Sequence, residues 1–385
     1  MVADGKDGLD DPGAIVERWA RELDWRASVL AAAERRGTRV HIVGGAIRDL
    51  LLGARPGDVD LVVEGDATAL ALELDAAASV HDRFGTARAE LGGSRLDLAT
   101  ARTETYPAPG ALPVVRDATI EADLDRRDFT VNTIAAPLDD PAHLIDPHGG
   151  LVDLANARLE ILHEGSIRDD PTRALRAARY AARLGFRLSG LARDRIAEAE
   201  LETVSGDRID AELATILSER APVAALRLLA DWGLLAGDLD RLGDLVELAG
   251  SSPWTGRVAP MPAALEAGEI RCGPAVHRIP DRSRRLARLG EGPASSLARA
   301  ARGASIAELA IAAVLGAEWP RTYVGEWSHL RAEIGGEDLL AAGIEPGPAI
   351  GLGLEAALAA RLDGEADSRD EQLEIALAAA RRAAP

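Results

Sequence analysis

Residues 41–64, HIVGGAIRDLLLGARPGDVDLVVE, constrain the fold of this chain more than any other stretch. An apolar strand leads into Gly44-Gly45 and a short helix, and a second strand follows with Asp58 and Asp60 one residue apart. Alternate residues of a strand point to the same face, so the two carboxylates should lie side by side. The stretch therefore predicts a strand–turn–helix–strand unit that carries an acidic pair.

This acidic pair indicates metal-dependent phosphate chemistry. Adjacent carboxylates repel each other unless a cation lies between them, and Mg²⁺ prefers hard oxygen ligands. Upstream, Gly44 and Gly45 allow backbone N–H groups to approach an anion at the start of a helix. A site that gathers phosphates and Mg²⁺ is typical of phosphoryl or nucleotidyl transfer. Asp97, on a later predicted strand, is a further candidate metal ligand, with a structural or surface role as the alternative.

The composition limits the classes of protein that fit. A length of 385 residues allows two or more domains, and 47% apolar with 28% charged residues is ordinary for a globular protein. No run approaches the roughly 20 apolar residues of a membrane span. The first residues lack the basic and apolar regions of a signal peptide. We therefore expect a cytoplasmic protein that does not enter a membrane.

The net charge of −19 argues against a generic nucleic-acid binder, which normally presents a basic face. Two arginine-rich segments, 168–187 and 278–302, nevertheless stand out on the acidic chain. They predict local basic surfaces, since net charge does not determine the local field. Solvated helix faces that balance nearby acids are the alternative.

The pattern of apolar residues changes near residue 151. Before it, short apolar runs alternate with helical segments, as in a mixed α/β domain; the predicted strands are 39–43, 59–63, 87–91 and 96–100. Residues 13–36 have the composition of one helix, and 106–115 should be a loop because it is rich in Pro and Gly. After residue 151 the chain has helical periodicity, with predicted helices at 170–184, 191–202, 208–218 and 222–234.

Two polar segments complete the candidate site. In DLDRRDFTVNT, residues 123–133, Arg126 and Arg127 precede Asp128. Arginine forks bind phosphates or sugar hydroxyls bidentately, and a neighbouring aspartate can orient them. Alone, the segment also fits a structural ion-pair motif.

The second segment is 168–187, in which Asp169 is predicted as the N-cap of a helix with Pro171 in its first turn. Arg173 then starts a row of arginines at three-residue steps, which continues with Arg176 and Arg179. Asp170 and Arg173 offer an acceptor and a donor fork that can match the Watson–Crick edge of a base. A capped helix with surface arginines is the alternative for this segment alone.

Taken in order, these segments resemble the class II tRNA nucleotidyltransferase and bacterial poly(A) polymerase family of the polymerase-β-like superfamily. The matching pieces are GGAIRD (44–49), DVD (58–60), ARTETY (101–106), DLDRRDFTVNT (123–133), DPHGGLVDL (146–154), DDPTRALRAAR (169–179), DRIDAEL (207–213), GIEPGP (343–348) and LDG (362–364). The resemblance implies an α+β fold whose nucleotidyltransferase head, with a mixed sheet and an N-terminal helix, occupies 1–150. A helical neck with the base-reading helix would occupy 151–220, and a helical, tRNA-binding body and tail would occupy 221–385.

The same resemblance implies the roles of single residues. Asp58 and Asp60 would hold Mg²⁺, which activates the 3′-hydroxyl of an RNA primer for attack on a nucleotide α-phosphate. The triphosphate would lie against Gly44, Gly45 and Arg48.

The remaining roles concern the nucleoside. Arg127 and Asp128 would hold the ribose, and Asp170 and Arg173 would read the base of CTP or ATP. Arg176 and Arg179 would support the triphosphate or the base-reading pair.

The implied function is template-independent addition of CMP and/or AMP to the tRNA 3′ end, with contacts to the acceptor and TψC half of tRNA. Asp169 stands where the family usually has Glu, and the segment after Tyr106 has no charge until Arg116. Family members that add CCA, CC or A differ around such loops, so all three specificities stay open. A poly(A) polymerase and an inactive RNA-binding module are further alternatives.

Overall fold

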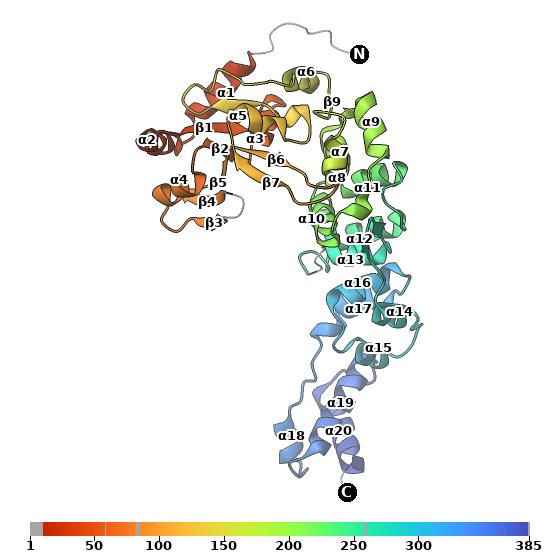
Figure 1. Ribbon diagram of the computed structural model, residues 1–385. Helices are drawn as coiled ribbons and strands as arrows, with labels where there is room; N and C mark the ends of the chain where they lie inside the picture. The colour runs from red at the N-terminus through yellow and green to blue at the C-terminus, as the bar shows by residue number, and fades with distance from the viewer. Residues whose placement is uncertain (1–10, 58, 82–84, 258–259, 384–385) are drawn as a thin grey trace, which may run out of the picture. The chain divides into compact units, whose positions relative to one another are not determined.

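The structure of this chain is a computed structural model that describes residues 11–57, 59–81, 85–257 and 260–383 (Figure 1). The chain divides into two compact units. The first contains residues 1–212 and 219–234, and the second contains residues 213–218 and 235–385. The mixed sheet and its helices belong to the first unit, and the second unit is almost wholly helical.

A six-stranded mixed sheet lies at the centre of the first unit. Its spatial order is β3 (Ser79–His81), β4 (Thr86–Leu91), β5 (Ser94–Thr100), β2 (Val59–Glu64), β1 (Arg39–Val43) and β8 (Ala135–Pro137). Strands β2 and β5 run parallel, and the other neighbouring pairs are antiparallel. The four predicted strands are confirmed, with three of them extended at one end.

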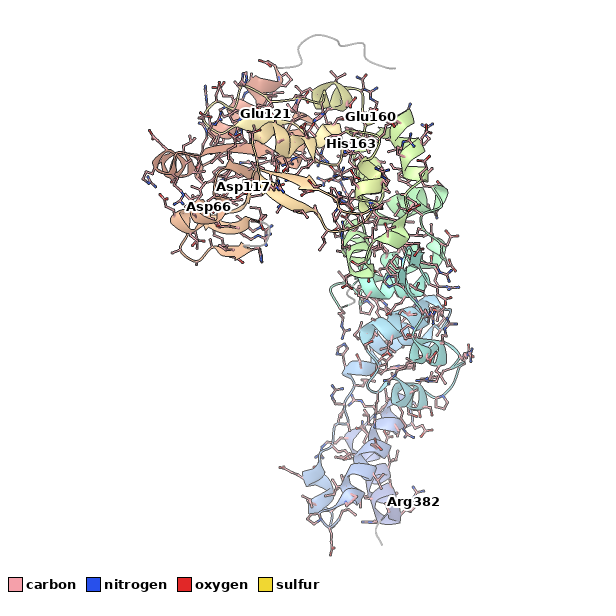
Figure 2. The ribbon with its side chains drawn as sticks, viewed as in Figure 1. Asp66, Asp117, Glu121, Glu160, His163 and Arg382 are labelled. Carbon is pink, nitrogen blue, oxygen red and sulfur yellow. The ribbon has the colours of Figure 1, made fainter. Side chains whose placement is uncertain are left out.

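Helices α1 (Pro12–Arg21), α2 (Arg26–Arg36), α3 (Gly45–Leu51) and α4 (Ala67–Leu74) pack against the sheet through one apolar core. Asp66 caps α4, because its Oδ1 accepts a hydrogen bond from the Ala69 N–H (Figure 2). The prediction of one helix over 13–36 is wrong. The helix breaks after Arg21, and Trp25 at the break is only 3% exposed and joins the core.

The alternation of side chains along β2 divides its residues between two faces. Val59, Leu61 and Val63 lie in the core beneath the helices. Val62 joins a second apolar cluster on the opposite face with residues of α5 (Ile120–Asp125). Because side chains alternate, Asp60 shares the face of Val62, where it is exposed.

A separate hairpin pairs β6 (Arg102–Thr105) with β7 (Val114–Asp117). The predicted loop over 106–115 is therefore too long, because Val114 and Val115 pair with Thr105 and Glu104 as strand residues. We call the remaining residues, 106–113, the connection.

The rest of the first unit is mostly helical and packs around Phe129 and the buried face of α8. Its elements are the short helix η2 (Thr130–Asn132), α6 (Gly150–Ala155), α7 (Ser166–Asp169), α8 (Thr172–Leu184), α9 (Gly190–Ala197), η3 (Leu201–Thr203), the start of α10 (Gly206–Leu217), α11 (Pro222–Asp231) and the paired strands β9 (Arg158–Leu159) and β10 (Arg187–Leu188). The predicted N-cap role of Asp169 is wrong. Asp169 ends α7, and Asp170 instead accepts the Thr172 N–H at 3.1 Å.

The second unit consists of helices joined by short turns. Its elements are α12 (Leu239–Gly250), α13 (Pro260–Ala267), β11 (Arg271–Cys272), β12 (Ala275–Val276), α14 (Asp281–Ala287), α15 (Ala294–Ala301), α16 (Ile306–Val314), α17 (Trp319–Gly325), η4 (Trp327–His329), α18 (Gly336–Ala341), α19 (Pro348–Leu362) and α20 (Arg369–Ala383). Across the described parts of the chain, every helix is too short or too polar to cross a bilayer.

Candidate active site

Two carboxylates lie side by side on the exposed face of the sheet. Asp60 of β2 pairs in register with Asp97 of β5, and both line a pocket of about 320 Å³. Arg88 of β4 donates from Nε to Asp97 Oδ1 at 2.7 Å. Among the described residues, no group of three or more His, Cys, Asp or Glu side chains converges as a metal site. Asp58, the other predicted metal ligand, lies outside the described residues.

The glycine turn brings two arginines together at the start of α3. Gly44 has φ +63°, and a Cβ placed on it would lie 2.8 Å from Arg127 Nη1. A side chain at this position would therefore be strained and would collide with Arg127. A Cβ on Gly45 would lie 3.6 Å from Arg48 Nη2. The turn thus brings its backbone close to two guanidinium groups.

Arg48 is 3% exposed and is held by polar and aromatic contacts. It donates to Asn132 Oδ1 at 2.5 Å and to Asp49 Oδ1 at 2.8 Å. Its guanidinium lies 5.0 Å from the ring centre of Tyr180, and that of Arg179 lies 4.5 Å from the same ring. Arg48 and Arg179 therefore contact the same ring. Arg179 is not among the described residues that line a pocket together with Arg173 and Arg176.

Asp123 holds the tandem arginines in place. This carboxylate is fully buried and accepts from Arg126 Nη2 at 2.6 Å and from Arg127 Nη2 at 3.0 Å. Burial alone would raise its pKa, but the positive charges of Arg127 and Arg126 lower the pKa below its ordinary value. Asp123 therefore stays ionised and fixes both forks.

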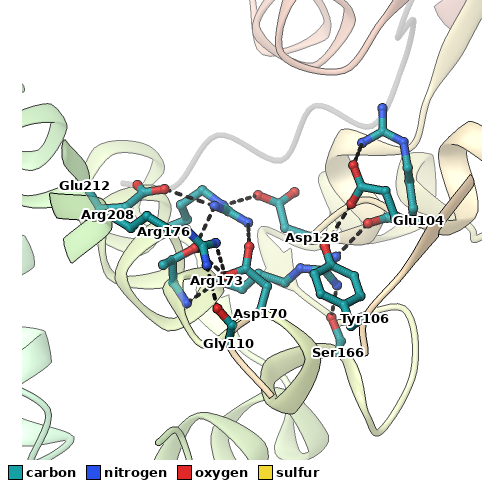
Figure 3. A network of polar contacts seen from close by, with 12 residues as sticks. Glu104, Tyr106, Gly110, Asp128, Ser166, Asp170, Arg173, Arg176, Arg208 and Glu212 are labelled. Carbon is teal, nitrogen blue, oxygen red and sulfur yellow. Dashed lines mark hydrogen bonds and ion pairs between the residues drawn. The ribbon is translucent and has the colours of Figure 1, made fainter. Parts of the chain in front are cut away.

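A pocket of about 550 Å³ joins the arginine pair to helix α8 (Figure 3). Its described lining consists of Thr86, Arg102, Glu104, Tyr106, Pro113, Arg126, Arg127, Asp128, Asp170, Arg173, Arg176 and Arg208. Thr86, Arg126 and Arg127 also line the smaller pocket of Asp60 and Asp97, so the two pockets meet at these residues.

Arg176 bridges three carboxylates at this pocket. It donates to Asp128 Oδ2 at 3.0 Å and to Glu212 Oε1 at 2.9 Å, and lies 3.4 Å from Asp170 Oδ2. Burial alone would raise the pKa of Asp128 and of Asp170, but the positive charge of Arg176 leads the effects that lower both pKa values. The two aspartates are therefore fixed as carboxylates.

Arg173 is 3% exposed and is held by two hydrogen bonds from its guanidinium group. It donates from Nη1 to Ser166 Oγ at 2.5 Å and from Nη2 to the Arg126 carbonyl at 2.6 Å, while its Nε is buried without a hydrogen-bond partner. Since each Nη carries two hydrogens, the fork keeps donor capacity for a ligand.

The β6–β7 hairpin supplies the remaining wall of the pocket. Glu104 Oε1 accepts from Arg102 and Arg126, each at 3.0 Å. Glu104 Oε2 accepts the Tyr106 hydroxyl at 2.8 Å. Burial, followed by the charge of Glu104, raises the pKa of Tyr106 to about 12, so the phenol stays protonated.

The structure gathers most of the predicted residues. Arg127, Asp128, Asp170, Arg173 and Arg176 line one pocket. Residues without a predicted role also belong to the network, namely Glu104, Asp123, Asn132, Arg208 and Glu212. All five lie in segments already singled out by the motif pattern, but nothing in the sequence indicates which partners they contact.

Comparison with known proteins gives a consistent result. The family described as the poly(A) polymerase head domain matches residues 40–160. An A-adding tRNA nucleotidyltransferase of Aquifex aeolicus is 50% identical over 157 residues, or 39% of this chain. The chain spans only 19% of the length of that relative.

Two further proteins match over most of their length. A solved CCA-adding enzyme of Thermotoga maritima, complexed with tRNA, has a TM-score of 0.71 at 28% identity, with 96% of this chain and 98% of that chain covered. A CC-adding tRNA nucleotidyltransferase of Deinococcus radiodurans is 35% identical over 371 residues, with 92% of this chain and 91% of that protein covered. With its mixed-sheet head and helical remainder, this chain belongs to the tRNA nucleotidyltransferase family.

Proposed function

We propose that this chain adds CMP and/or AMP, taken from CTP and ATP, to the 3′ end of tRNA. The observation that carries this proposal is the shared lining of the two pockets. A carboxylate–guanidinium pair suited to a base edge, Asp170 and Arg173, lines a pocket that meets the pocket of Asp60 and Asp97. A nucleotide bound in the larger pocket can therefore extend its phosphates toward Asp60 and Asp97. We call this carboxylate pair, on the face of the central strands β2 and β5, the strand edge.

The base would be selected by hydrogen-bond polarity. Cytosine and adenine both present an exocyclic amine beside a ring-nitrogen acceptor. The Asp170 carboxylate would accept from that amine, and Arg173 would donate to the ring nitrogen. Uracil and guanine present a carbonyl oxygen at the first position, which the carboxylate would repel. The protein, rather than a nucleic-acid template, would then set the nucleotide choice.

The positions of the sugar and the phosphates would follow from the position of the base. Asp128 and Arg127 would hold the ribose, since both line the pocket beside the base-reading pair. Arg127 also reaches Gly44, so the triphosphate would extend along the glycine turn toward Gly45 and Arg48. Arg176 would keep Asp128 and Asp170 in place, and Arg179 would support Arg48 through Tyr180.

The strand edge fits a divalent cation such as Mg²⁺. Asp60 and Asp97 offer hard carboxylate oxygens from neighbouring strands, and Asp58 would be the further ligand that the sequence pattern predicts. Bound Mg²⁺ supplies Lewis-acid activation of the primer 3′-hydroxyl and stabilises charge on the pyrophosphate leaving group. The chain itself would orient the α-phosphate by fixing the base, ribose and triphosphate.

The domain roles complete the proposal. Residues 1–150 would form the catalytic head, residues 151–220 the neck that carries the base-reading helix, and residues 221–385 the body and tail that contact the acceptor and TψC half of tRNA. Exposed arginines such as Arg285 and Arg288 on and just after α14 suit RNA phosphates. A cytoplasmic location fits these substrates.

The test uses three tRNA transcripts, one ending at the discriminator base, one with the first C and one with both. Each is incubated with Mg²⁺ and with CTP, ATP or both, and the product ends are sequenced. Completion of CCA on the shortest transcript identifies a full CCA-adding enzyme. Addition that stops after CC, or that needs a CC end and ATP, identifies a split activity, as in the names of the Deinococcus and Aquifex relatives. Long A tails would indicate a poly(A) polymerase, and no incorporation would contradict the proposal.

A further inference from the structure

Arg208 of α10 contacts both Asp170 of the nucleotide pocket and the connection (Figure 3). Its Nη2 donates to Asp170 Oδ1 at 2.8 Å, and its Nη1 donates to the carbonyl oxygen of Gly110 at 2.9 Å. Gly110 belongs to the connection between β6 and β7. One planar fork therefore joins this segment to the carboxylate proposed to read the base.

The two oxygens of Asp170 have different environments. Oδ1 accepts from Arg208, from the Thr172 N–H at 3.1 Å and from the Thr172 hydroxyl at 2.7 Å. Oδ2 lies 3.4 Å from Arg176, a long contact for a charged hydrogen bond. Arg208 thus helps to fix Oδ1, and Oδ2 keeps acceptor capacity for a ligand.

The connection is held closely where Arg208 reaches it. The Gly110 N–H donates to the Asp169 carbonyl at 3.3 Å. Gly110 has φ +69°, and a Cβ built on it would lie 2.4 Å from Thr203 Oγ1 and 2.7 Å from the Thr203 carbonyl. A shift of this backbone would therefore change the partner of one arm of the Arg208 fork.

We propose that Arg208 is a positioning residue that couples the connection to the orientation of the Asp170 carboxylate. Through that carboxylate, it sets how strictly the pocket prefers CTP and ATP, which carry an exocyclic amine, over UTP and GTP, which carry a carbonyl. This inference rests on the proposed function. With the fork intact, Oδ1 is fixed and Oδ2 meets the base in one orientation. Without the fork, Oδ1 keeps only its two bonds from Thr172. The carboxylate is then held less firmly, and the penalty against a carbonyl falls.

The first test removes the guanidinium fork and keeps an unbranched aliphatic stem. Arg208→Met should lower the ratio of correct to incorrect nucleotide incorporation about tenfold or more, the effect of losing one hydrogen bond to a charged group. Arg208→Lys keeps the charge but has a single nitrogen, so its ratio should fall between those of Arg208→Met and the unmodified chain. Arg21→Gln, which removes an arginine paired with Glu17 on α1, is the matched control and should leave the ratio unchanged.

The second test asks whether the connection acts through Arg208. Gly110→Ala should lower the same ratio in the unmodified background, because it forces the connection to move. In the Arg208→Met background it should add little, since the coupling is already broken. A merely structural role of Arg208 would instead give additive losses, and additive losses in the ratio would overturn the proposal.

Two measurements separate this inference from the proposed function. Thermal unfolding identifies a variant that does not fold, and Arg208→Lys then carries the test. Equilibrium binding of CTP, ATP, UTP and GTP without RNA reports the preference independently of transfer. An unchanged preference in folded Arg208 variants overturns the inference while incorporation by the unmodified chain still supports the function. Absence of incorporation by the unmodified chain contradicts the function itself, whatever the Arg208 variants show in binding.

Discussion

The strand edge and the proposed nucleotide pocket bury their carboxylates to different degrees. Asp60 at the edge is exposed, and the Asp97 side chain remains 33% exposed although it pairs with Arg88. In the pocket, the side chains of Asp128 and Asp170 are only 12% and 9% exposed, and Arg176 bridges them. The pocket is thus fixed by the chain's own charges, whereas the edge suits a cation supplied from solution. Under the proposed function, nucleotide binding and reaction chemistry would be divided between these two neighbouring surfaces.

Asp60→Asn tests this difference with the largest expected effect. Loss of the carboxylate should reduce nucleotide incorporation about 10³-fold or more, because a bound metal supplies several kcal/mol of transition-state stabilisation. Since Asp60 is exposed, the melting temperature should change by no more than about 2 °C. Primer extension and calorimetry measure the two quantities. Incorporation at the normal rate would show that the strand edge is not the catalytic surface.

Arg176→Met tests the opposite property of the pocket. Removing this bridge leaves buried carboxylates without their main partner, which typically costs about 3–5 kcal/mol of the free energy of unfolding. Chemical denaturation followed by circular dichroism measures this loss, and CTP binding should weaken in parallel. The exposed Arg21→Gln replacement should cost less than about 0.5 kcal/mol. Equal losses in the free energy of unfolding from both replacements would show that the buried ion pairs of the pocket contribute no more to stability than an exposed surface pair.

Acid should remove the contribution of Asp128 and Asp170 to folding stability over a defined range of pH. The folded pKa values of Asp128 and Asp170 lie below the ordinary value of 3.8, so the folded chain holds fewer protons there than the unfolded chain. Their contribution to stability is complete above that ordinary value and is lost as pH falls through the lowered values. Urea unfolding of the unmodified chain and of Asp170→Asn should therefore differ by a constant amount from pH 7 to pH 5. A difference that shrinks within that range would contradict the ionised state of Asp170.

The smallest expected effect concerns Arg88→Gln at the strand edge. Arg88 occupies one oxygen of Asp97, so its removal should make that carboxylate more available to a cation. We expect the Mg²⁺ concentration for half-maximal incorporation to fall, by roughly tenfold at most, since exposed ion pairs are worth about 1 kcal/mol or less. A rise in the required Mg²⁺ would show that Arg88 organises Asp97 for the metal.

Local patterns in the sequence predicted the framework of the sheet face that carries Asp60. The alternation around Asp60, the strand 39–43 and the helix from Thr172 to Leu184 follow from side-chain period and turn residues. The same reasoning failed at the break before Trp25 and at Asp169. At the first place, Trp25 joins the apolar core at a break that helical composition does not indicate. At the second, Asp170 rather than Asp169 accepts the Thr172 N–H.

The sequence by itself therefore determined four of the six strands of the sheet, several helices before residue 235, the face that carries Asp60, and the short list of polar segments proposed to bind a nucleotide. Only the tertiary structure decided how those segments meet. The pairing of Arg208 with Gly110 joins residues 98 positions apart, and that of Arg48 with Asn132 joins residues 84 positions apart. Local periodicity fixes which face a side chain occupies, because it depends on neighbouring residues alone. The partner of a charged fork depends on which distant backbone and side-chain groups the packed core brings within hydrogen-bond distance.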